Sequence, residues 1–214
     1  MVIAIIGILA ALLLPVLSAA KQRAWTAQCQ SNLHQIGLGM KMFADENNEL
    51  YPESGGGIAW DQKDATTGNY SWMQQIFSLV QNTNVYHCPA NKLLSWDQQS
   101  AFNYFNGARA AYIASDPDPA NRHFASVDSK QIRFPVAYVL SGDTLDFKPS
   151  DADKDDYSQN CVGDAANPDD RNEEWQAHSK GQNLLFEDDH AKWYKTYNTN
   201  EMTFRYDAMH WWSE

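Results

Sequence analysis

The first twenty residues are the most apolar stretch of the chain. They read MVIAIIGILAALLLPVLSAA, and no charged side chain occurs before Lys21. At about 1.5 Å per residue, a helix of this length covers most of the roughly 30 Å hydrocarbon core of a bilayer. The pattern predicts a helix over residues 1–20 that needs lipid or other helices around it. Pro15 lies inside it and is expected to kink or locally open the helix, because proline lacks a backbone donor.

A second helical pattern follows without interruption. Apolar side chains recur at steps of three and four residues and form one stripe, made of Trp25, Cys29, Leu33, Ile36, Met40 and Phe43. Away from the stripe the side chains are polar, as at Lys21, Arg23, Gln28, Asn32 and Gln35. Polar turn-forming residues replace the stripe at positions 45–48. We therefore expect one helix from residue 1 to about residue 47, with an amphipathic part over 21–47 that packs on a globular body.

A cleaved signal peptide is the competing interpretation of the apolar segment. Ser18, Ala19 and Ala20 are small, as at a cleavage site. However, no basic residue precedes the apolar run, and a signal peptide has no reason to continue in phase into an amphipathic helix. The continuation favours a retained helix, and a secreted protein cleaved after Ala20 stays the alternative.

The remaining residues, 48–214, are expected to form one head domain of the α+β class. Apolar residues at helical steps predict a short helix over 72–80, and an apolar segment before Pro89 predicts an extended stretch over 85–89. The run VAYVLSGD predicts a strand over 136–143. A hairpin is expected over 182–186 and 191–194, a long acidic surface loop over 147–173, and a docked aromatic segment over 206–212. The expected fold is a long N-terminal helix packed on a small antiparallel sheet with long loops.

Several of these segments carry a resemblance to a known family. The stretches VIAIIGILAALLLPVLSAA and CQSNLHQIGLGMKMFADENNELYP, with Pro15 in the apolar helix, resemble the N-terminal region of type IV pilin-like proteins and type II secretion pseudopilins. The stretch HSKGQNLLFEDDHAKW resembles the H-x9-D-G motif that ends the head in a large bacterial group of them. His178 and Asp188 keep that spacing, His190 follows, and Asp189 replaces the glycine of the motif.

The resemblance implies a filament subunit. It implies processing and N-terminal methylation by a prepilin peptidase, a single-pass inner-membrane location before assembly, a periplasmic head, and packing of residues 1–20 into a cell-surface filament core. Family members also carry a basic leader, a processing site, a phenylalanine and a glutamate at the start, none of which precedes Val2. We therefore expect Met1 to be an internal start or the edge of a truncated sequence.

Charge narrows the range of partners. The formal net charge is −11 at pH 7, which argues against nucleic-acid binding and suits a soluble head outside the cell. The expected partners are copies of this chain or related pilins.

The His/Asp cluster near the C-terminus has two interpretations. His178, Asp188 and His190 could supply ligands for zinc or a similar ion. Alternatively, His178 hydrogen-bonds the hairpin turn and Asp188 caps it. The second interpretation is favoured, because no separate nucleophile or general base presents itself by spacing.

An acidic segment offers a further candidate for metal binding. Asp151, Asp153 and Asp155 resemble the start of a calcium loop, but the glycine and glutamate that an EF-hand needs are absent. A solvated acidic loop is the favoured interpretation. Because some pseudopilin heads bind calcium in a loop, the resemblance keeps calcium open as a cofactor, and no other cofactor is expected.

Three cysteines, at positions 29, 88 and 161, suggest one disulfide and one remaining thiol. Cys29 and Cys88 both lie in family-like segments, and their pairing would join the helix to the head. Pairing of Cys88 with Cys161 would instead hold the acidic loop. The first pairing is favoured.

These patterns predict a structural, non-enzymatic filament subunit of a type IV pilus or type II secretion pseudopilus. The alternative from a different class is a membrane-anchored periplasmic binding protein or metal-dependent hydrolase that uses the His178, Asp188 and His190 region.

Overall fold

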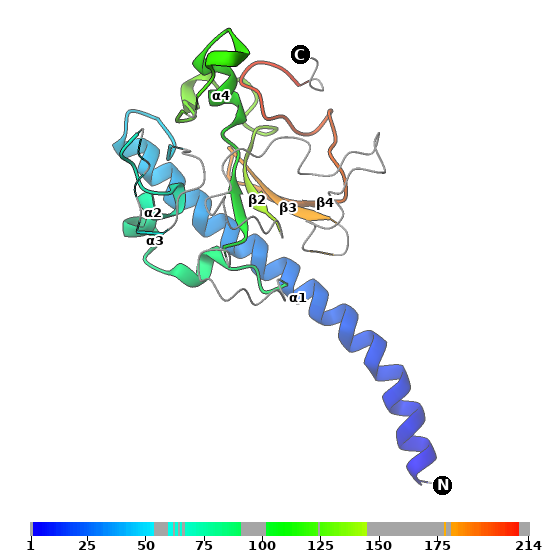
Figure 1. Ribbon diagram of the computed structural model, residues 1–214. Coiled ribbons are helices and arrows are strands. Elements are labelled where there is room, and N and C mark those ends of the chain that lie inside the picture. The colour runs from blue at the N-terminus through cyan, green and yellow to red at the C-terminus, as the bar shows by residue number, and fades with distance from the viewer. Residues whose placement is uncertain are drawn as a thin grey trace.

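The computed structural model describes residues 2–53, 60–61, 63, 65, 67–90, 102–123, 125–144, 178 and 181–209. One long helix, α1 (Val2–Glu46), leads into a head that contains a small antiparallel sheet (Figure 1). The remaining helical elements are α2 (Trp72–Gln75), α3 (Phe77–Val80), η1 (Thr83–Tyr86), α4 (Arg109–Ser115), η2 (Pro119–Asn121) and η3 (Ser129–Gln131). The strands are β1 (Tyr104–Asn106), β2 (Val139–Asp143), β3 (Gln182–Phe186) and β4 (Ala191–Tyr194). The predicted α+β class is confirmed.

α1 is one helix along its whole length, and it passes Pro15 without interruption. Figure 1 shows α1 as one continuous, gently curved helix. The helix ends where the polar residues begin, and Asn48 and Glu49 follow with positive φ angles of 59° and 69°. The backbone N–H of Glu49 donates to the carbonyl of Ala44 at 2.8 Å, which closes the C-terminal turn.

The sheet has the strand order β1-β2-β3-β4, and every neighbouring pair is antiparallel. The sheet separates two hydrophobic cores, and the side chains of β3 contribute to both. Leu185 contributes to the core that contains Cys29, Leu33, Ile36 and Met40 of α1, whereas Leu184 and Phe186 contribute to a second core with Phe204. Successive side chains of a strand point to opposite faces, so one face of the sheet packs on α1 and the other on the C-terminal segment.

The helix and the sheet approach each other closely. A Cβ atom built on Gly37 of α1 would lie 2.8 Å from a methyl group of Leu185. The buried face of α1 is also wider than the apolar stripe predicts, because Asn32 is buried as well. The Asn32 amide donates to the carbonyl of His87 at 3.1 Å and to the Tyr104 hydroxyl at 3.2 Å, which explains how a polar side chain is accommodated there.

The predicted hairpin matches β3 and β4. The predicted helix over 72–80 is present as α2 and α3, which are separated at Ile76. The expected extended stretch over 85–89 is partly wrong, because Val85 and Tyr86 belong to η1. The Asn82 side chain accepts a hydrogen bond from the backbone N–H of Asn84 and thereby caps this turn. The expected acidic loop over 147–173 and the residues after 209 lie outside the described residues.

Gly107 allows the chain after β1 to pass against β2. A Cβ atom at this position would lie 2.1 Å from the carbonyl oxygen of Val139, which belongs to the backbone. We expect Gly107→Ala to lower the free energy of unfolding by roughly 1–3 kcal/mol, because the strand must shift to relieve this contact. Denaturant unfolding of the full chain in detergent measures the effect. Gly7→Ala is the control, since no atom lies within 4 Å of a Cβ atom there. Equal stability of the two variants would contradict the close packing.

Candidate functional site

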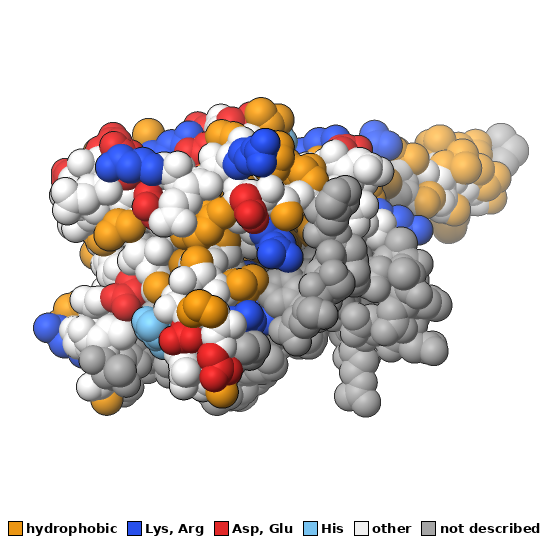
Figure 2. All heavy atoms as spheres, turned by 90° about the horizontal axis from the view of Figure 1, so that it is seen from above, with side chains coloured by type: hydrophobic (Ala, Val, Ile, Leu, Met, Phe, Trp, Pro, Cys, Tyr) orange, Lys and Arg blue, Asp and Glu red, His pale blue; other side chains and the backbone are white. Residues whose placement is uncertain are grey.

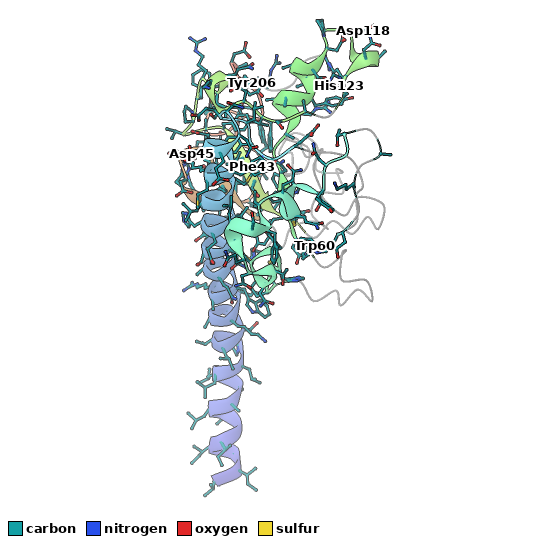
Figure 3. The ribbon with its side chains drawn as sticks, turned by 90° about the vertical axis from the view of Figure 1, so that its left-hand side faces the viewer. Phe43, Asp45, Trp60, Asp118, His123 and Tyr206 are labelled. Atoms are coloured by element: carbon teal, nitrogen blue, oxygen red, sulfur yellow. The ribbon has the colours of Figure 1, made fainter. Side chains whose placement is uncertain are left out.

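The N-terminal half of α1 extends away from the head, and its side chains are directed into the surroundings on all sides (Figure 3). Its large apolar side chains are exposed: Val2, Ile3, Ile5, Ile6, Ile8, Leu9, Leu12, Leu13, Leu14, Val16 and Leu17. Figure 2 shows the same segment as an apolar projection beside the mixed polar surface of the head. By length and composition α1 could cross a membrane, although a signal sequence near an N-terminus has the same character.

A buried polar cluster lies where α1 enters the head. Four side chains contribute possible metal ligands whose donor atoms all lie within 4.8 Å of one another: Cys29 of α1, Cys88 after η1, Asp143 at the end of β2, and His178 before β3. All four are at most 3% exposed. The cluster therefore joins the helix to three segments of the head that are far apart in the sequence.

The structure brings Cys29 and Cys88 together. Their Sγ atoms are 2.8 Å apart, and both cysteines are free thiols here. Cys88 is positioned by its backbone N–H, which donates to Asn103 Oδ1 at 3.0 Å. The hydrogen bond with Cys29 and burial raise the pKa of the Cys88 thiol well above its usual range. A disulfide between these residues stays a prediction, and Cys161 lies outside the described residues.

His178 forms a buried ion pair with Asp143. The His178 Nε2 atom lies 3.1 Å from Asp143 Oδ2 and 3.3 Å from Cys88 Sγ. The Asp143 carboxylate accepts two further hydrogen bonds from Asn183, from its backbone N–H at 2.9 Å and from its side-chain amide at 2.6 Å. This carboxylate is therefore held in place from both sides by donors.

Thr26 indicates the protonation state of His178. The Thr26 hydroxyl donates its hydrogen to the carbonyl of Gln22 at 3.1 Å, so it accepts from His178 Nδ1, which lies 3.3 Å away. An imidazolium satisfies both contacts, with Nδ1–H directed at Thr26 and Nε2–H directed at Asp143. Burial lowers the pKa of His178, but the hydrogen bond to Asp143 and the contact with Cys88 outweigh it, and the pKa rises to about 9.

The observed contacts correct the expected role of His178. Its ring does not bond the hairpin turn, because its two nitrogen atoms contact Thr26, Cys88 and Asp143 instead. Only its backbone reaches the hairpin, where its carbonyl accepts from Trp193 Nε1 at 3.0 Å. Asp188 does cap the turn, accepting from the backbone N–H of His190 at 3.3 Å. Asp189 has a φ angle of 75°, in the region that the glycine of the motif would favour.

The predicted ligands that the structure describes, His178, Asp188 and His190, do not gather into one site. Among the described residues, His178 belongs to the cluster with Cys29, Cys88 and Asp143. His190 instead bonds Asp188 and stacks on Phe186 with ring centroids 4.2 Å apart. Asp151, Asp153 and Asp155 lie outside the described residues. Sequence reasoning missed Asp143, and the available signal was an aspartate directly at the end of an apolar strand.

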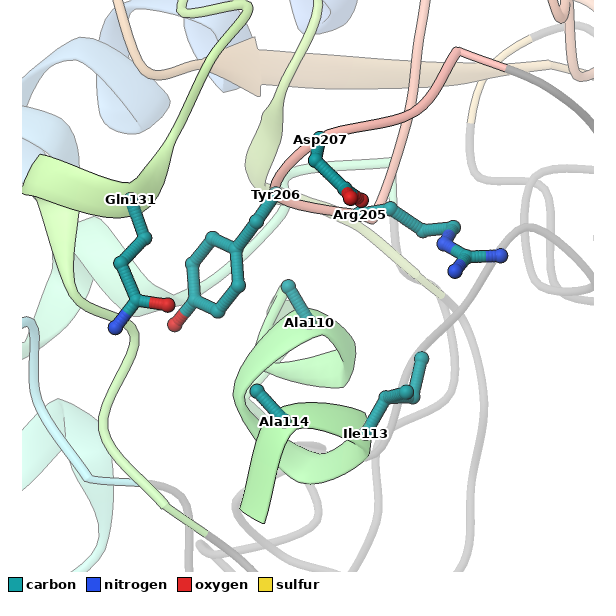
Figure 4. Close-up of a pocket in the computed structure, with 7 residues that line it drawn as sticks. All are labelled: Ala110, Ile113, Ala114, Gln131, Arg205, Tyr206 and Asp207. Atoms are coloured by element: carbon teal, nitrogen blue, oxygen red, sulfur yellow. The ribbon is translucent and has the colours of Figure 1, made fainter. Parts of the chain in front are cut away.

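A separate surface groove of about 420 Å³ lies between α4 and the C-terminal segment (Figure 4). Its lining consists of Ala110, Ile113, Ala114, Gln131, Arg205, Tyr206 and Asp207. The Tyr206 hydroxyl already accepts a hydrogen bond from the backbone N–H of Asp128 at 2.9 Å. The groove therefore combines apolar side chains of α4 with polar and charged ones, and it contains none of the clustered cysteine and histidine side chains.

The fold and the cluster define a class of protein: one long helix, apolar where it is exposed, that carries a small α+β head fastened to its C-terminal half. The chain belongs to the family described as "Protein of unknown function (DUF1559)", with the short name SBP_bac_10, whose model matches residues 18–205. No curated protein and no solved structure matches the chain.

Proposed function

We propose that the chain is a structural subunit of a filament of the type IV pilus or type II secretion pseudopilus kind, anchored in a membrane before assembly. The observation that carries this proposal is the projecting half of α1, whose large apolar side chains from Val2 to Leu17 are 51–86% exposed. Water is an unfavourable environment for this surface, so it requires lipid or neighbouring helices. The family membership and the resemblance of the N-terminal and C-terminal motifs support the same proposal.

Assembly exchanges one apolar environment for another. Lipid and helix neighbours are similarly apolar, so close packing between helices has to supply the driving force. Gly7, Ala10 and Ala11 are small, which permits close approach of neighbouring copies along this part of α1. A head-to-tail arrangement that does not close into a ring produces a filament.

The head suits a location outside the cytoplasm. The net charge of −11 keeps neighbouring heads soluble, and α1 supplies the only described segment that could enter a membrane. The buried cluster also supports a structural rather than a catalytic role, because a substrate has no access to side chains that are at most 3% exposed.

Removal of residues 1–20 tests the proposal. We expect the shortened chain to be monomeric in plain buffer, while the full chain requires detergent or is recovered as a filament. Size-exclusion chromatography with light scattering and sedimentation of cell extracts measure the difference. A full-length chain that stays monomeric without detergent would contradict the proposal.

Gly7→Leu separates anchoring from assembly. This variant remains as apolar as the parent and still enters a membrane, but its larger side chain prevents close helix approach. We expect it in the membrane fraction with few or no filaments in electron micrographs. Abundant filaments from this variant would show that close packing at Gly7 is not required.

A further inference from the structure

Cys29 marks the place where the helix enters the head. Counted from the N-terminus of α1, it is the first buried residue, and the residues before it are exposed or half-buried. Thr26, one turn earlier, contacts His178 of the head. Any separation of the helix from the head must begin at this end of the buried surface, so a bond placed here has the largest effect on separation.

The segment that carries Cys88 is fixed before any bond forms. The backbone N–H of Asn103 donates to the carbonyl of Tyr86 at 2.9 Å, and Asn103 Oδ1 accepts from Cys88 N–H. On the other side, the Asn32 amide of α1 donates to the carbonyl of His87. The position of Cys88 against α1 is therefore set by hydrogen bonds from the backbone of this segment to Asn32 of α1 and to Asn103, which directly precedes β1.

We propose that Cys29 and Cys88 form a disulfide that fastens α1 to the head at the point where the helix leaves it. The bond joins residues 59 positions apart in the sequence. It would add a covalent link to the noncovalent contacts between α1 and the segment that carries Cys88. In the reaction, the S–S bond of a disulfide oxidant breaks, and the oxidant takes up two electrons and the two thiol protons and leaves as two thiols, while one S–S bond forms between the Sγ atoms of Cys29 and Cys88. The proposal deepens the proposed function, because an extracytoplasmic head lies in an oxidising compartment.

The other two members of the cluster already have complete partners. His178 donates to Asp143 and Thr26, and Asp143 also accepts two bonds from Asn183. The cluster therefore divides into a bonded His–Asp pair and an adjacent pair of sulfur atoms. A metal ion held by all four side chains is the competing outcome, and it would have to replace the contact between His178 and Asp143.

The bond has a defined consequence for a filament. A helix packed in the filament core and a head outside it are pulled relative to each other under load. With the disulfide present, separation of the head from α1 cannot begin at the Cys29 end of the buried helix surface. We infer that the oxidised subunit keeps α1 attached to the head under conditions that release it in the reduced subunit.

Peptide mapping tests the bond directly. The full chain with Cys161→Ser is unfolded and reduced in detergent, refolded in a glutathione redox buffer, alkylated and digested without reduction. The expected result is a linked peptide pair that contains Cys29 and Cys88, with no alkylated form of either. Elemental analysis runs in parallel after refolding with added zinc. Two alkylated thiols, or stoichiometric zinc that Asp143→Asn removes, would overturn the proposal.

Hydrogen exchange tests the consequence. In the oxidised chain, the amides of residues 26–33 are expected to exchange more slowly than in the reduced chain, by a factor on the order of ten. The amides of residues 2–20, held in detergent, serve as an internal control and are expected to be unchanged. Equal exchange at residues 26–33 in both states would overturn the fastening role. Both experiments use the isolated subunit, so their failure is distinguishable from a failure to form filaments.

Discussion

Asp143→Asn is expected to lower the free energy of unfolding by about 3–5 kcal/mol, because the buried His178 imidazolium then either lacks a compensating charge or has to lose its proton. Asp143 is fully buried, and its carboxylate lies 3.1 Å from His178 Nε2. The new amide group also turns a donor toward Asn183, which donates to both carboxylate oxygens in the parent. The substitution therefore removes a charge partner and at least one hydrogen bond at the same time. Denaturant unfolding of the full chain in detergent measures the loss.

Asp188→Asn is the matched control, because Asp188 forms another His–Asp pair in the described part of the head. Its partner His190 is about one-third exposed, as is Asp188 itself. An exposed pair of this kind contributes at most about 1 kcal/mol. The expected ranking is therefore a large loss at Asp143 and a small one at Asp188. If the two variants lose similar free energies of unfolding, burial does not determine how much the Asp143–His178 pair contributes to stability.

Local periodicity was sufficient to predict α1 and the β3–β4 hairpin. In α1 the apolar stripe contains Cys29, Leu33, Ile36 and Met40, and all four are fully buried. These elements are long or strongly patterned, so local sequence determines them. α4 was missed, because Arg109–Ser115 is a short helix in a segment rich in alanine, aspartate and proline, and its formation depends on packing against the head.

The partners of His178 could not be predicted from spacing. The H-x9-D motif directed attention to Asp188, which lies in the same hairpin, whereas the observed partner Asp143 belongs to β2. β2 and β3 are antiparallel, with Gly142 opposite Leu184, and this pairing brings Asp143 beside Asn183 and the residues that precede β3. Such a contact arises from sheet topology, which a single sequence does not specify. The proximity of Cys29 and Cys88 was predicted because both lie in family-like segments.

The stability of the head is expected to fall as the pH rises from about 6.5 to about 9. The pKa of His178 is raised from 6.5 to about 9 in the folded chain, so the folded state binds its proton more tightly than the unfolded state does. The stabilisation is fully present below about pH 6.5 and is lost as the pH rises through about 9. Each tenfold change in proton affinity corresponds to about 1.4 kcal/mol, so the full effect is roughly 3 kcal/mol.

Asp143→Asn is expected to remove most of this pH dependence, because Asp143 is the charge that retains the proton on His178. Among the residues that the structure describes, the other titratable groups beside the pair are Cys29, Cys88 and Tyr104. Burial raises the pKa of Tyr104 well above its usual value, so it stays neutral over this range. Refolding in an oxidising glutathione buffer is expected to remove the cysteines from the titration. Chemical unfolding of parent and variant between pH 6 and 9.5 measures the difference between them at each pH. If the difference in the free energy of unfolding between parent and variant is constant across this range, Asp143 does not raise the pKa of His178.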